Sequence, residues 1–129
     1  MQWRTTFGAM VALSAALVGA LLFASGVLWW TFGVAGQADG DFAFRRAGML
    51  FVLIGLVALA MRDAPPSRLR ARLALAFAAG MAGLVLLGLG EVLRGFAGLG
   101  ALAPVIAETG FGIAFARHWL QDRHLPEAV

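Results

Sequence analysis

Four long apolar runs, separated by short polar connections, constrain this 129-residue chain more than any other feature. Their expected bounds are about 7–31, 43–61, 69–93 and 101–120. Each is close to the roughly 20 residues that a helix needs to cross a bilayer core. Runs rich in Ala, Leu and Gly favour helices over strands, and the alternating segments of an outer-membrane barrel are absent from the sequence. The sequence therefore predicts an all-α membrane protein, a four-transmembrane-helix bundle forming a single domain over 1–129.

The composition supports a membrane location and excludes several classes of site. Hydrophobic residues make up 61% of the chain and charged residues 13%. A soluble domain of this size has too little interior to hide so much apolar surface. All ten basic side chains are Arg and stand in short connections or at helix ends, so the net charge of +3 does not indicate nucleic-acid binding. The absence of Cys excludes disulfides, thiolate metal sites and cysteine nucleophiles.

The first run allows two interpretations. A secretory signal has an apolar stretch of roughly 7–15 residues, whereas this run is about 25 residues long, which favours a retained helix. Cleavage near Ala24–Ser25 is the alternative. Further along, Pro65 and Pro66 must end the second helix, and Ser67 can cap the third.

The arginines predict the orientation. Seven of the ten fall on one side of a four-helix topology. They are Arg4, Arg62, Arg68, Arg70, Arg72, Arg117 and Arg123. Because cytoplasmic loops are enriched in basic residues, we expect a bacterial inner-membrane protein with both termini in the cytoplasm. Trp3 and Trp119 are then expected at the inner interface and Trp29 and Trp30 at the outer one. His118 is expected to be interfacial, and the tail after residue 120 to be frayed.

Glu108 is the residue that points most clearly to a site. It lies several residues into the fourth run, where an ionised carboxylate facing lipid costs on the order of 2–3 kcal/mol, so it should face the bundle interior. Arg45 shares a helical face with glycines and is the expected partner, with Arg46 as its substitute after a helix rotation of about 100°. Glu91 should lie at the same depth. We therefore expect an Arg45–Glu108 pair with Glu91 nearby.

This charge cluster has two possible roles. It can be a structural ion pair that fixes how the helices are arranged, or a polar pocket for a proton, an ion or a small ligand. We expect a structural or accessory protein that packs with itself or with a larger membrane complex. The alternative is a binder or carrier of a small molecule, a lipid, a quinone or a proton-coupled substrate, with its pocket at Glu108. No nucleophile set, metal motif or nucleotide fingerprint is present in the sequence, so we expect no enzyme activity, cofactor, metal or nucleic-acid partner.

The start of the second run, Phe44-Arg45-Arg46-Ala47-Gly48, the later Gly55 and the acidic Glu108 carry a resemblance. The chain resembles a family of small four-helix bacterial membrane proteins known only as a domain of unknown function and distantly similar to DoxX-like proteins. The resemblance implies a four-helix bundle in the cytoplasmic membrane and no established activity.

Overall fold

The computed structural model describes residues 2–36 and 38–126. These residues form five α-helices and a short 3-10 helix, with no strand among them, which confirms the all-α prediction. The elements are α1 (Trp3–Phe23), α2 (Ser25–Phe32), α3 (Ala38–Met61), α4 (Arg68–Leu93), η1 (Leu99–Ala101) and α5 (Leu102–Asp122). Four segments are long and apolar enough to cross a membrane: Trp3–Phe23, Gly40–Met61, Arg68–Leu93 and Leu99–Asp122.

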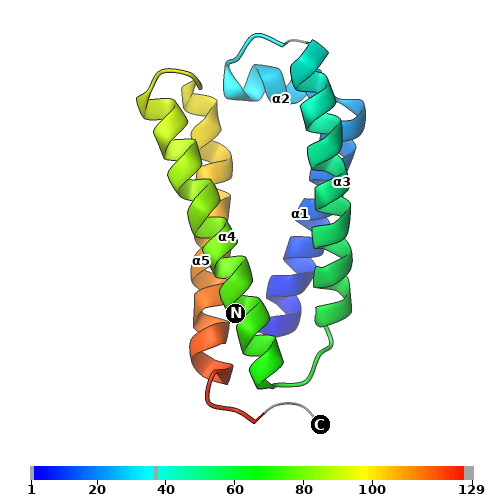
Figure 1. Cartoon of the computed structure of the whole chain (residues 1–129), viewed down its shortest axis with the longest axis vertical. Coiled ribbons are helices and arrows are strands. Elements are labelled where there is room, and N and C mark those ends of the chain that lie inside the picture. The colour runs from blue at the N-terminus through cyan, green and yellow to red at the C-terminus, as the bar shows by residue number, and fades with distance from the viewer. Residues whose placement is uncertain (1, 37, 127–129) are drawn as a thin grey trace.

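The first apolar run is not one helix, so its expected bounds of 7–31 are wrong. The helix begins at Trp3 and ends at Phe23, and Ala24, with φ −139° and ψ 42°, breaks it. The 21 residues of α1 are about 31 Å long at 1.5 Å per residue, which already crosses a bilayer core. The remainder of the run forms α2, which turns across the bundle (Figure 1).

Tertiary contacts of Trp29 hold α2 in this position. Its indole Nε1 donates a hydrogen bond to Asp41 of α3 at 2.8 Å, and its ring stacks on Phe44 with 4.4 Å between centroids. Trp29 is therefore half-buried against α3, whereas its neighbour Trp30 is 83% exposed and can serve as the expected interfacial anchor.

The four spans associate as two pairs. α1 packs along α3 and α4 packs along α5, while contacts between the pairs are few. Figure 1 shows the pairs meeting at the end where α1 begins and α5 ends, and separating toward α2. We call the first of these the terminal end and the other the α2 end. The seven arginines counted above fall at the terminal end.

The core lies at the terminal end. Its members are aromatic, Met and Ala side chains from all four spans: Trp3, Phe7, Met10, Ala58, Ala74, Met81 and Phe115. The ring of Phe7 contacts Phe77 and Phe115 edge-on, with centroids 5.6 and 5.1 Å apart. Since lipid is as apolar as these side chains, this packing stabilises the bundle through van der Waals contact and not through removal of water.

The helix ends follow local signals. The Ser67 hydroxyl accepts a hydrogen bond from the backbone N–H of Arg70 at 3.2 Å, which confirms it as the N-cap of α4. Pro104 lies in the first turn of α5, where its missing N–H costs nothing. The last helix runs on to Asp122, two residues beyond its expected end, because the ion pair between Asp122 and Arg70 of α4 holds its final turn.

Candidate functional site

An apolar cavity of about 670 Å³ lies at the α2 end. One side is formed by Phe32 and Val34, at and after the end of α2, and the other by α4, η1 and α5. Among its apolar lining residues are Leu84 and Leu87 of α4 and Val105 of α5. Its volume is in the range of small-molecule sites, roughly 300–1,000 Å³.

Two carboxylates line this cavity. Glu91 stands in the last turn of α4 and Glu108 in the second turn of α5. Because α4 and α5 pack side by side in opposite directions, the end of one helix meets the start of the other. Glu91 and Glu108 therefore line the same cavity from two neighbouring helices.

The two acids differ in their partners. The Arg94 guanidinium approaches Glu91, with 3.7 Å between Nη1 and Oε1. No ion pair or hydrogen bond joins the Glu108 carboxylate to another group in residues 2–36 and 38–126. Glu108 thus brings an acid group without a protein partner into apolar surroundings, a placement that typically marks a functional position in a membrane protein.

Arg45 and Arg46 do not reach this cavity, and the expected Arg45–Glu108 pair is not formed. Both arginines are exposed on α3. Arg45 interacts electrostatically with Asp41 one turn earlier, and Arg46 lies over the Phe42 ring at 5.8 Å. The prediction failed because α3 pairs with α1 and not with α5, so that equal depth in the bilayer does not make Arg45 and Glu108 neighbours.

A second apolar cavity, of about 440 Å³, continues the first toward the core. Leu84 lines both, and Gly80, Phe77 and Met10 lie further along. From Glu91 to Phe77 this route follows α4 for about 21 Å, at 1.5 Å per residue. The elongated shape suits a molecule with a polar head and an apolar tail.

The backbone closes the α2 end. The N–H of Gly98, just before η1, donates to the carbonyl oxygen of Phe32 at 2.6 Å. A Cβ on Gly98 would lie 3.3 Å from the Cα of Gly33, and one on Gly100 would collide with the carbonyl oxygen of Thr31. Glycine therefore permits the two backbones to touch here. This contact joins the α1–α3 helical pair to the α4–α5 helical pair beyond the cavity.

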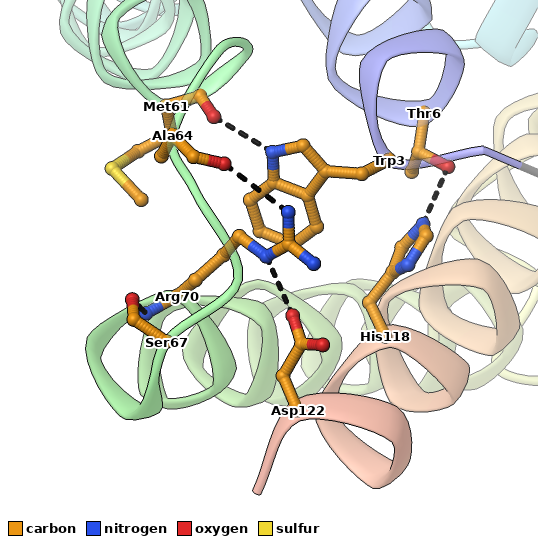
Figure 2. A network of polar contacts seen from close by, with 8 residues as sticks. All are labelled: Trp3, Thr6, Met61, Ala64, Ser67, Arg70, His118 and Asp122. Atoms are coloured by element: carbon orange, nitrogen blue, oxygen red, sulfur yellow. Dashed lines mark hydrogen bonds and ion pairs between the residues drawn. The ribbon is translucent and has the colours of Figure 1, made fainter. Parts of the chain in front are cut away.

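The terminal end holds a polar network centred on Arg70 (Figure 2). The guanidinium donates to the carboxylate of Asp122, with 2.5 Å between Nε and Oδ2, and to the carbonyl oxygen of Ala64 at 3.1 Å. Its carbon lies 4.3 Å from the centroid of the Trp3 ring, in cation–π contact. The side chains of Arg70 and Asp122 are only 11% and 8% exposed.

The same network connects the other helices. The Trp3 indole donates to the carbonyl oxygen of Met61 at 2.8 Å, and Thr6 shares a hydrogen bond of 2.9 Å with Nε2 of His118 (Figure 2). All four spans thus contribute. Because each polar side chain drawn in Figure 2 has at least one protein partner, the arrangement is that of a structural clamp that holds the two helical pairs together.

Sequence reasoning missed this network. Trp3 and His118 were expected at the membrane interface but are buried, and Asp122, assigned to a frayed tail, is buried as well. A signal was available: Phe111, Phe115, His118 and Asp122 recur at intervals of three or four and so share one helical face. Phe115 belongs to the core and Phe111 packs against it. His118 and Asp122 share their helical face and therefore had to point inward too.

No group of three His, Cys, Asp or Glu side chains that could hold a metal ion occurs in the part of the chain that the structure describes. Comparison with known protein families, with curated proteins and with solved structures finds no match. The resemblance to DoxX-like proteins therefore stays a prediction.

Proposed function

We propose that this protein binds a small amphiphilic molecule of the membrane between its two helical pairs. The observation that carries the proposal is the elongated apolar cavity that ends at the carboxylates of Glu91 and Glu108. An apolar pocket with a few convergent polar groups is the usual form of a small-molecule site. We infer binding or carriage and not catalysis, because the cavity offers no nucleophile beside a base.

A structural or accessory role is the second candidate. Added Cβ atoms on Gly83, Gly90 and Gly110 would meet nothing within 4 Å, so these glycines offer surface for close approach of another helix. A purely structural bundle, however, would gain nothing in packing from two adjoining cavities. We therefore favour the binding role over the accessory one.

The location that we propose is a bacterial inner membrane, crossed four times. The number of spans and the Thr6–His118 contact support chain ends on one side of the membrane. The seven arginines at that end support the cytoplasm as that side. In this orientation the cavity lies in the outer half of the bilayer.

Photolabelling tests the binding role. The purified protein in phosphatidylcholine vesicles is irradiated with a long-chain alcohol that carries a diazirine in its chain, and labelled peptides are mapped by mass spectrometry. We expect saturable labelling of residues around Leu84. Leu84→Trp fills the junction of the two cavities and should reduce labelling severalfold. Leu89→Trp is the matched control, since the two leucines are 38% and 39% exposed and Leu89 lines neither cavity.

Labelling that never saturates and spreads evenly over the lipid-facing side chains would contradict the proposal. The accessory role would then be favoured if cross-linking at Gly83 or Gly110 captured a second copy of the chain.

A further inference from the structure

We propose that the ligand is a lipophilic cation, an amphiphile whose ammonium group is joined directly to an apolar tail, with the ammonium beside Glu108. This inference rests on the proposed binding function and names the chemical class of the ligand. It is carried by the charge balance of the cavity and by the shape of the route that leads away from it.

The charge balance favours a cation. Arg94 compensates Glu91, whereas Glu108 has no partner in the described residues. A carboxylate in apolar surroundings either takes up a proton or needs a counter-charge, and a ligand ammonium supplies that counter-charge by direct charge contact. A ligand carboxylate or phosphate at the same place would be repelled, and a neutral head would leave the charge of Glu108 uncompensated.

Two aromatic rings strengthen this preference. Phe32 and Phe96 line the same cavity as Glu108. The face of an aromatic ring carries negative partial charge and attracts ammonium groups. A site that combines one free carboxylate with two phenyl rings therefore matches a cation better than it matches a hydroxyl or a quinone carbonyl.

The route away from Glu108 explains why the tail should follow the ammonium directly. Beyond Leu84, the second cavity is lined by Met10, Ile54, Ala76, Phe77, Gly80 and Met81. None of these side chains carries a charge or a hydrogen-bonding group. A phosphate or a sugar between the ammonium and the tail would have to lie in this apolar region without a partner.

Three photolabels with one shared alkyl-diazirine chain test the inference. They end in a trimethylammonium, a hydroxyl or a carboxylate group, and each is titrated into the full protein in phosphatidylcholine vesicles, as mole fraction in the membrane. For the unmodified protein we expect half-saturation by the ammonium probe at a mole fraction about tenfold lower than by the hydroxyl probe. The carboxylate probe should bind more weakly than either.

A charge variant assigns the preference to Glu108. Glu108→Gln keeps the shape of the side chain and should bring the ammonium and hydroxyl probes to within about twofold of each other. Asp63→Asn makes the same chemical change at an exposed position of the terminal end and should leave the tenfold preference intact.

The outcomes separate the two proposals. Equal, saturable binding of all three probes to the unmodified protein overturns the cation assignment and leaves the binding function standing. No saturable binding of any probe overturns both. The comparison of probes on the unmodified protein decides the cation assignment even if Glu108→Gln does not fold.

Discussion

Arg70 of α4 and Asp122 of α5 form a buried ion pair, although 52 positions of sequence separate them. The pair lies where the two helical pairs meet, because the guanidinium also covers the Trp3 ring of α1. At the opposite end, the helical pairs are joined by backbone contacts that Gly98 and Gly100 make with residues 31–33. The cavity that we assign to ligand binding lies between these two junctions.

Loss of one partner of this ion pair should harm the fold more than loss of both. Asp122→Ala leaves a buried cation, which costs roughly 3–5 kcal/mol in the free energy of unfolding. The double variant Arg70→Met, Asp122→Leu should recover much of that loss. Unfolding of both variants is measured in one detergent. Arg4→Ala is the control: its pair with Asp63 is 72% and 64% exposed and should matter by less than about 1 kcal/mol. A double variant no more stable than Asp122→Ala would argue against the clamp.

The Thr6–His118 hydrogen bond yields a second prediction. Thr6→Val keeps the shape of the side chain but leaves the buried imidazole without its partner, which should cost about 1–3 kcal/mol. The neighbouring Thr5 is exposed, so Thr5→Val should be close to neutral. Thermal unfolding of both variants in detergent compares them directly. Equal stability of the two would mean that the hydrogen bond does not hold α1 to α5.

The contact between Thr31 and Gly100 predicts how the α2 end can be opened. Gly100→Ala places a methyl group against a backbone carbonyl that cannot move aside, so α2 and η1 must separate. Spin labels on exposed Trp30→Cys and Leu99→Cys report their distance, and the chain has no native Cys to interfere. We expect a longer distance in the Gly100→Ala background. Gly110→Ala, where the methyl group meets open space, should leave the distance unchanged.

The distribution of arginines predicts the orientation of the chain in the membrane. A reporter fused after Val129 should be active in the cytoplasm, and one inserted after Gly36 should be active in the periplasm. A periplasmic C-terminus would reverse the orientation, and the cavity would then lie in the inner leaflet. The helix packing would be unaffected.

Local signals account for what could be predicted from the sequence. The four spans, the cap at Ser67 and the place of Pro104 each depend on a few consecutive residues, and the structure agrees with them. The common region of Glu91 and Glu108 followed from chain direction alone, since two helices joined by a short loop must run side by side. The first helix was misjudged because Trp29, which holds α2 across the bundle, contacts residues more than ten positions away.

The sequence by itself determined the four segments that are long and apolar enough to cross a membrane, and the end of the bundle at which each arginine lies. Only the tertiary structure decided which helices pair, and hence that Arg45 stays apart from Glu108 while Arg70 meets Asp122. The physical reason is the solvent. In water, a helix marks its packed face with an apolar stripe, whereas in a bilayer the lipid-facing and protein-facing sides are both apolar. The partners are then selected by the fit of side chains from distant parts of the chain, which no local pattern records.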